Sequence, residues 1–310
     1  MEVTSAEEDK IKDTVHSTVD EELADSGIEQ EPKNKNNASL VQEVILKIPP
    51  LTVIYWCEKM TATTFGETFA DLFTQTLDFG YSATSAVLLS FFIISLGFQL
   101  WVTTYWPMLF WTVMATSSIA GTCVSDFIDR TLGWGYPLGM GVLLSILLVI
   151  VGFWKLSGES MNVAGSMTRK AECFYWSAIL VSNTLGTALG DCMADTLNLG
   201  FALSAGIIGS LLIICVALTY FTKVSRVLLF WVAFVLTRPF GATFGDLLTK
   251  SKAKGGLALG TLYASMVILA LFLVAFGIEM YNLHKAKKLK AKEASMEAKE
   301  ASLEAEEVVE

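Results

Sequence analysis

The chain has 310 residues, of which 53% are hydrophobic, and its mean hydropathy is +0.52. These values exclude an ordinary soluble domain and favour an integral membrane protein. The net charge of −9 lies mostly in the two ends of the chain. The histidines, His16 and His284, also lie there, which argues against a histidine metal site or a histidine-based catalytic triad.

The predicted elements begin with residues 1–48, an acidic segment poor in aromatic residues, which is a composition typical of disorder. Apolar segments follow, each long enough to cross a bilayer as a helix of about 20 residues. We place eight crossings at 51–75, 80–103, 106–130, 135–155, 172–196, 200–222, 226–249 and 256–280. Residues 283–310 form a charged tail, predicted to be a solvated helix. The predicted fold class is an all-α integral membrane protein.

One motif recurs along the apolar part of the chain. A Gly lies ten residues after a Trp, and an Asp lies five residues after that Gly, in four copies: Trp56–Gly66–Asp71, Trp111–Gly121–Asp126, Trp176–Gly186–Asp191 and Trp231–Gly241–Asp246. A fixed internal period indicates a repeat architecture. We therefore predict four two-helix repeats with parallel pseudo-symmetry about the membrane normal, divided into halves at 49–158 and 159–282.

The connection within each repeat is short and ends at a second Gly, nine residues after the Asp: Gly80, Gly135, Gly200 and Gly255. Short connections predict that the two helices of one repeat pack as an antiparallel hairpin. The motif glycines themselves allow two interpretations. They permit close helix packing, or they mark a break that exposes backbone groups to an ion.

Polar residues recur every fourth position along the motif helices, and so share one helical face. The stripes are Lys59, Thr63, Glu67, Asp71 and Gln75; Ser118, Thr122, Asp126 and Arg130; Asn183, Thr187, Asp191 and Asp195; and Arg238, Asp246 and Lys250. Polar side chains in a membrane turn toward each other or toward water. We therefore expect the motif helices inside the bundle, lining a central polar core, and their apolar partners outside.

The acidic members of these stripes are candidate ion-binding residues, because a carboxylate inside a membrane is costly. Asp71, Asp126, Asp191 and Asp246 are predicted to form a cation-coordinating or proton-accepting layer, with Glu67 and Asp195 as additional carboxylates. Arg238 and Lys59 are predicted counter-charges. Arg238 is expected to pair with Glu67, Asp71 or Asp191. The polar lining consists of Thr63, Ser118, Thr122, Asn183 and Thr187.

The motif segments 59–71, 185–196 and 237–246 resemble a bacterial family described only as a membrane-anchored protein built from repeats of unknown function. The resemblance covers about residues 51–280 and leaves out both ends of the chain. It implies a polytopic inner-membrane protein, and it implies no particular activity or substrate.

The residues favour a transporter of a cation, with or without coupling to protons. Carboxylate oxygens suit a hard cation, and no cofactor, nucleic-acid partner or enzyme motif is expected. Two alternatives remain: a transporter of a small polar or anionic solute together with a proton, and a membrane scaffold or sensor that acts through the two ends. The metal, if any, and self-association are left open. The basic residues near helix ends predict that both termini lie in the cytoplasm, and the resemblance implies an inner-membrane location.

Overall fold

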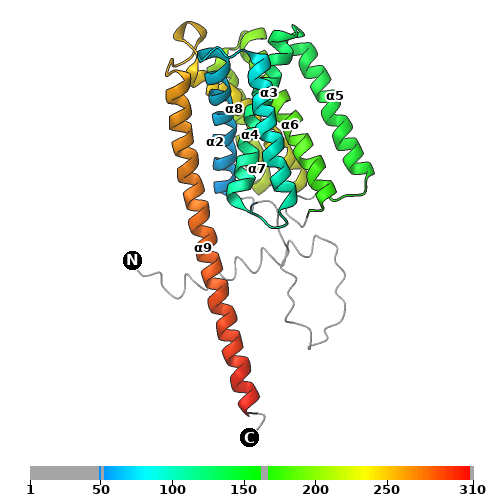
Figure 1. Ribbon diagram of the computed structural model, residues 1–310, viewed down its shortest axis with the longest axis vertical. Helices are drawn as coiled ribbons and strands as arrows, with labels where there is room; N and C mark the ends of the chain where they lie inside the picture. Colours follow the sequence, from blue (N-terminus) through cyan, green and yellow to red (C-terminus); the bar gives the residue numbers. More distant parts are fainter. Residues whose placement is uncertain (1–48, 50–51, 162–166, 308–310) are drawn as a thin grey trace. The chain divides into compact units, whose positions relative to one another are not determined.

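The computed structural model describes residues 49, 52–161 and 167–307, and the predicted disordered segment 1–48 lies outside them. Within these ranges the fold is all-α (Figure 1). The eight long helices of this part are α2 (Val53–Asp71), α3 (Tyr81–Trp101), α4 (Pro107–Asp126), α5 (Gly135–Leu156), α6 (Arg169–Asp191), α7 (Gly200–Phe221), α8 (Arg226–Thr249) and α9 (Thr261–Glu307). They correspond one to one with the predicted segments, and α9 continues without a break from the last apolar segment to Glu307.

The motif helices α2, α4, α6 and α8 form a closed inner ring. α2 packs against α4, α4 against α6, α6 against α8, and α8 against α2. In their most apolar stretches, 67% of α4 and 61% of α8 are buried, against 28% of α3 and α7 and 17% of α5 and α9. The predicted division into inner motif helices and outer apolar helices therefore matches the packing.

The outer helices do not pack as the sequence predicted. α3 packs against α4, α5 against α6, α7 against α8, and α9 returns to α2. Each outer helix thus covers the motif helix of the next repeat, and the expected hairpin within one repeat is wrong. A short connection makes the next helix run antiparallel to the previous one, but it does not determine against which inner helix the outer helix packs.

The motif glycines let the inner helices approach closely. An added Cβ at each would collide with a residue on the next helix of the ring: Gly66 with Ser118, Gly121 with Asn183, Gly186 with Arg238, and Gly241 with Thr63. Each of these glycines lies inside a continuous α-helix. The structure therefore supports the packing interpretation over a helix break at the glycine.

The helices change geometry directly after the motif Asp instead. Asp71, Asp126 and Asp191 are each followed by a five-residue π-helix, whereas α8 remains α-helical past Asp246 to Thr249. The π-helices are Leu72–Thr76, Phe127–Thr131 and Cys192–Thr196. Short π-helical segments inside α-helices are rare and occur frequently at functional sites. The irregular geometry therefore lies at the level of the motif aspartates.

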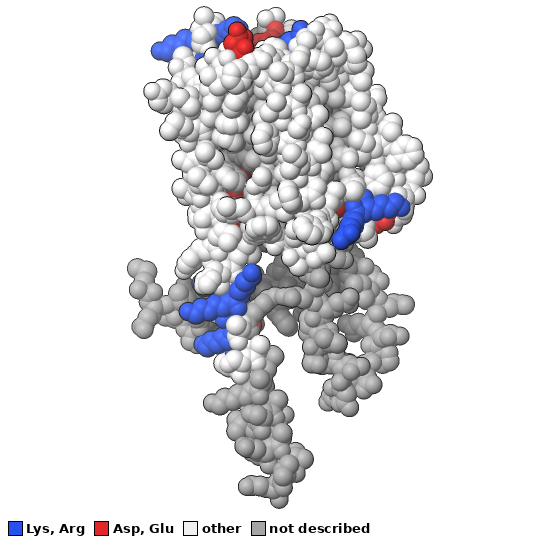
Figure 2. All heavy atoms as spheres, viewed as in Figure 1, with Lys and Arg blue, Asp and Glu red and all other residues white. Residues whose placement is uncertain are grey.

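Six of the described helices are long and apolar enough to span a membrane, namely α3, α4 with its π-helix, α5, α7, α8 and α9. The remaining long helices, α2 and α6, carry several charged residues, and both belong to the inner ring. On the face shown in Figure 2, Lys and Arg side chains gather toward the ends, and none appears in the broad band between them. The length and composition of these helices and the charge-free band therefore suit a protein that spans a membrane.

Gly121→Ala should destabilise the protein by about 1–3 kcal/mol, because the new methyl group would overlap Asn183 and the backbone of Thr184. The matched control is Gly206→Ala on outer helix α7, where an added Cβ meets no atom within 4 Å. Alanine at that position should be neutral or slightly stabilising because of its higher helix propensity. Thermal unfolding in detergent compares the variants, and equal melting temperatures would contradict the close-packing role.

Candidate functional site

The polar stripes meet inside the inner ring. Thr63, Ser118, Asn183 and Arg238 have exposed fractions of 0–1%, and Asp71, Asp126, Asp191 and Asp246 of 1–2%. Glu67, Thr122 and Thr187 are also buried. Asp195 differs, because its side chain is exposed beyond the end of the ring, in the π-helix that follows α6. The structure therefore brings together the predicted site residues except Asp195 and, as shown below, Lys59.

Arg238 is the central residue of this core, with an exposed fraction of 0%. Its Nη2 donates to Glu67 Oε2 at 3.1 Å and to Thr187 Oγ1 at 2.7 Å, and also to Thr122 Oγ1. Its Nη1 donates to the Thr63 carbonyl oxygen at 3.1 Å. One guanidinium on α8 thus binds α2, α4 and α6. Of the three partners expected for Arg238, the structure pairs it with Glu67.

One turn beyond Glu67 lie the motif aspartates, and a basic residue bridges two of the adjacent pairs, Asp126–Asp191 and Asp71–Asp246. On α4, Arg130 contacts Asp126 Oδ1 through Nε at 3.0 Å, and Asp191 Oδ2 on α6 through Nη2 at 3.2 Å. The side chain of Arg130 remains 32% exposed. Arg130 therefore contacts two buried carboxylates and also reaches the surface at the Asp end of the ring.

Lys250 bridges the other two motif aspartates, Asp71 and Asp246. Its Nζ lies 2.7 Å from Asp71 Oδ2 and 3.1 Å from Asp246 Oδ1, and it donates to Gln75 Oε1 at 3.0 Å. Burial alone would lower the pKa of Lys250, but the carboxylates of Asp246 and Asp71 raise it above its usual value. The ammonium therefore stays charged. Gln75 completes the group by donating to Asp71 Oδ1 at 2.5 Å.

Arg130 and Lys250 were not among the predicted site residues. Both lie on the predicted polar stripes, four residues after the motif Asp, but they were interpreted as markers of the helix ends. That spacing places the cation directly above the carboxylate on the helix. The i,i+4 relationship was therefore the signal that would have identified them.

The charges at this end of the ring do not balance. The ion pairs join five carboxylates, Glu67, Asp71, Asp126, Asp191 and Asp246, to three cations, Arg130, Arg238 and Lys250. Five minus three leaves two negative charges when all groups are ionised. Such an excess in a low-dielectric core favours a bound cation or bound protons.

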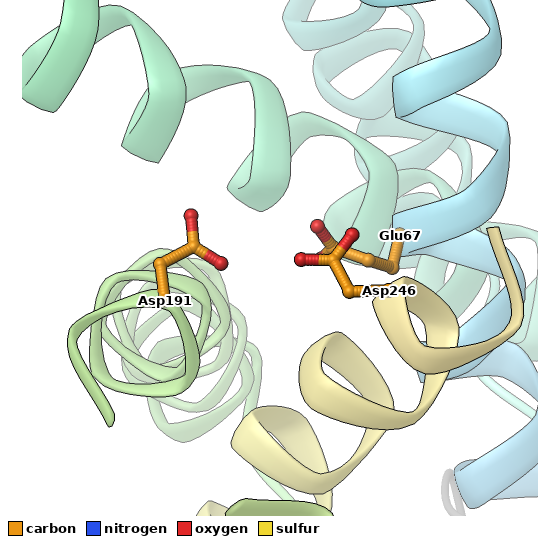
Figure 3. Close-up of side chains that lie close together, drawn as sticks. All are labelled: Glu67, Asp191 and Asp246. Atoms are coloured by element: carbon orange, nitrogen blue, oxygen red, sulfur yellow. The ribbon is translucent and has the colours of Figure 1, made fainter. Parts of the chain in front are cut away.

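Three of these carboxylates are arranged as a cation site. Oxygen atoms of Glu67, Asp191 and Asp246 lie within 4.8 Å of one another, and all three residues are buried. Figure 3 shows the Glu67 and Asp246 carboxylates side by side, with Asp191 on the facing helix. Asp246 Oδ1 has no hydrogen-bond donor of suitable geometry despite its proximity to Lys250. Carboxylate oxygens from three helices are the donor set that Mg²⁺, Ca²⁺ and Mn²⁺ prefer.

Lys59 lies deeper, with an exposed fraction of 0%. Its Nζ is 3.2 Å from Met114 Sδ and 3.7 Å from the centroid of the Phe234 ring. No carboxylate of the described residues forms an ion pair with it. The structure thus places this predicted counter-charge below Arg238, against sulfur and an aromatic face, and away from the acidic cluster.

An aromatic layer fills the opposite end of the inner ring. Each residue before a motif Trp contacts the motif Trp of a neighbouring inner helix: Tyr55 with Trp111, Phe110 with Trp176, Tyr175 with Trp231, and Phe230 with Trp56. The ring centroids lie 5.5–6.2 Å apart, a separation typical of interacting aromatic pairs. Polar groups therefore occupy the Asp end of the core, and aromatic rings occupy the Trp end.

Arg238→Ala should destabilise the protein by about 3–5 kcal/mol, because it leaves the buried Glu67 carboxylate without its charged partner. Arg238→Lys should restore little, since one ammonium cannot reproduce the planar set of donors. The double variant Arg238→Ala/Glu67→Gln should be more stable than Arg238→Ala alone. Melting temperatures in detergent measure this, with Arg226→Ala at the exposed start of α8 as the control. A double variant no more stable than the single one would contradict the pairing.

Comparison with known proteins identifies the repeats. A family model described as Repeat of Unknown Function (DUF347) matches four times, at residues 54–105, 109–160, 174–225 and 229–282. Each match spans one motif helix and the outer helix that follows it. No curated protein and no solved structure matches the chain significantly. The chain therefore belongs to the family built from this repeat of unknown function.

Proposed function

We propose that the protein is an integral membrane transporter of a hard cation, which exchanges for protons at the acidic cluster of the inner ring. The supporting observation is the buried group of Glu67, Asp191 and Asp246 oxygens, contributed by three helices and belonging to an ion-pair network with two surplus carboxylates. A divalent cation balances that surplus, and so do two protons. Competition between them for the same oxygens couples their movement.

The cation enters from the Asp end. A cavity of about 250 Å³ opens there and is lined by residues that include Asp71, Gln75 and Lys250. Arg130 and Lys250, whose side chains are 32% and 14% exposed, stand at the rim of the ring. Both are long and flexible, so they can withdraw from the aspartates when a cation replaces their charge. When no cation is bound, they act as counter-ions that hold the acidic cluster together.

Release toward the other side requires the aromatic layer to open. The rings of Tyr55, Phe110, Tyr175 and Phe230 are at most 8% exposed and fill the core at the Trp end. An arrangement open at the Asp end and filled at the Trp end suits one state of an alternating-access cycle.

In this proposal α2 and α6 also cross the membrane, which makes eight crossings. The charged residues inside these two helices are compatible with this because they are buried away from lipid, and Arg169 and Lys170 lie exposed at the start of α6. The cyclic packing supports parallel pseudo-symmetry about the membrane normal. At the Asp end, Arg130 and Lys250 are held in ion pairs and Lys252 and Lys254 are exposed, whereas more basic residues lie at the Trp end. This excess supports a cytoplasmic location for both termini in the inner membrane.

Asp191→Asn should reduce cation uptake into proteoliposomes at least tenfold, because it removes a charged ligand without changing side-chain size. Glu67→Gln and Asp246→Asn should do the same. Uptake of Mg²⁺, Mn²⁺, Ca²⁺ and Na⁺ is measured together with internal pH, and a transported cation should drive proton movement in the opposite direction.

Asp78→Asn is the matched control for these variants. Asp78 is exposed near the same end and has a φ of 53°, and Asn198, at the equivalent position of the third repeat, has a φ of 54°. Asn therefore fits that backbone, and uptake should remain at the wild-type level. Correctly folded Asp191→Asn with undiminished uptake, or proton movement that depends on no cation, would contradict the proposal.

The orientation is tested with single cysteines in a cysteine-free background. Ala253→Cys, in the turn that follows α8, should react with an impermeant thiol reagent added to intact cells. Ala294→Cys, in the exposed part of α9, should react only after the cells are opened. Labelling of Ala294→Cys from outside would reverse the proposed orientation.

A further inference from the structure

A second pair of buried acids lies outside the cluster described above. Glu58 on α2 has an exposed fraction of 0%, and neither of its carboxylate oxygens has a hydrogen-bond partner. An ionised carboxylate without donors in an apolar environment is strongly unfavourable, and such a group usually binds a proton or a cation. Glu58 therefore needs a partner that the hydrogen bonds of the protein do not supply.

The neighbouring titratable group is Glu279 on α9, whose carboxyl group is close enough to interact with that of Glu58. Glu279 is 7% exposed, and two donors already serve it. The Tyr105 hydroxyl donates to its Oε1 at 2.7 Å, and the Trp111 indole Nε1 donates to its Oε2 at 3.0 Å. The Glu279 carboxylate thus accepts a hydrogen bond at each oxygen, whereas no donor serves either oxygen of Glu58.

The other charged and titratable groups near this pair do not neutralise it. Lys59 is adjacent in sequence but directs its ammonium to Met114 and Phe234. Tyr55 and Tyr105 are the tyrosines that interact with Glu58, and both are neutral in their ordinary form. Within the described ranges, no Lys, Arg or His forms an ion pair with Glu58 or Glu279.

We propose that Glu58 and Glu279 form a proton-binding site at the contact between the first and last repeats. One proton from the aqueous phase binds Glu58, which then donates a hydrogen bond to the Glu279 carboxylate. With both groups ionised, neither can donate to the other, and two like charges face each other between α2 and α9. This site is separate from the Glu67–Asp191–Asp246 cluster and does not depend on cation transport.

The location of the pair gives the proton a structural consequence. The packing of α9 against α2 closes the outer layer, since α9 is the outer helix that covers α2. With the proton bound, a hydrogen bond joins the two acids, and with both groups ionised two like charges repel each other across the contact between α2 and α9. Stability from this site is therefore present while the proton is bound and is lost as pH rises until the pair ionises.

Infrared spectroscopy of the full chain in lipid tests the proposal directly. The difference between the wild-type spectrum and that of Glu58→Gln should contain the C=O stretch of the protonated Glu58 carboxyl group, which disappears at high pH and is separate from any band of the Glu67–Asp191–Asp246 cluster. Glu279→Gln should shift this band because the acceptor has changed. Glu293→Gln, on the exposed part of the same helix, should retain the wild-type band.

Melting temperatures across pH provide a second readout. The wild-type value should fall by several degrees more than that of Glu58→Gln as pH rises, because glutamine mimics the protonated acid and cannot ionise. If Glu58→Gln does not fold, Glu279→Gln decides by the same comparison, since it also removes the repulsion. An unchanged band together with an unchanged pH dependence in the variant that folds would overturn the proposal. If the wild-type protein takes up no cation but the infrared band and the pH dependence are as expected, only the transport function is contradicted.

Discussion

The inner ring depends on one buried guanidinium. Arg238 has no access to solvent, so its charge must be satisfied entirely by protein groups. It achieves this by contacting all three of the other inner helices, which fixes their relative height. The contacts require short distances between helices, and the motif glycines allow them. The motif glycines and Arg238 therefore act together: the glycines allow the short distances between helices that the contacts of Arg238 require.

Packing and charge follow different periods around the ring. The close approach at the motif glycine occurs at each of the four contacts, whereas a bridging cation occurs only on α4 and α8. At the corresponding positions, α2 has Gln75 and α6 has Asp195. A small residue is needed wherever two helices touch, so that position is repeated. Four cations at one level would repel each other, so alternate positions are neutral or acidic.

Helix positions and the inward direction of the stripes were predictable, because bilayer thickness and helical periodicity act locally along the chain. The i,i+4 relationship also predicted that Glu67 and Asp71 share a face. The sequence did not predict which groove each outer helix occupies, since that choice depends on packing across repeats. For the same reason the Glu58–Glu279 contact was not predicted: it joins the first and last repeats and has no local pattern.

Each outer helix packs on the motif helix of the next repeat, so every repeat depends on its neighbour to cover its motif helix. Any fragment cut between repeats would end with one motif helix uncovered and one outer helix without a surface to cover. These two faces are complementary, because α9 covers α2 in the way that α5 covers α6. Two copies of a two-repeat fragment can therefore complete each other head to tail. Gene duplication and fusion of such a self-associating ancestor would produce the present chain without inventing a new interface.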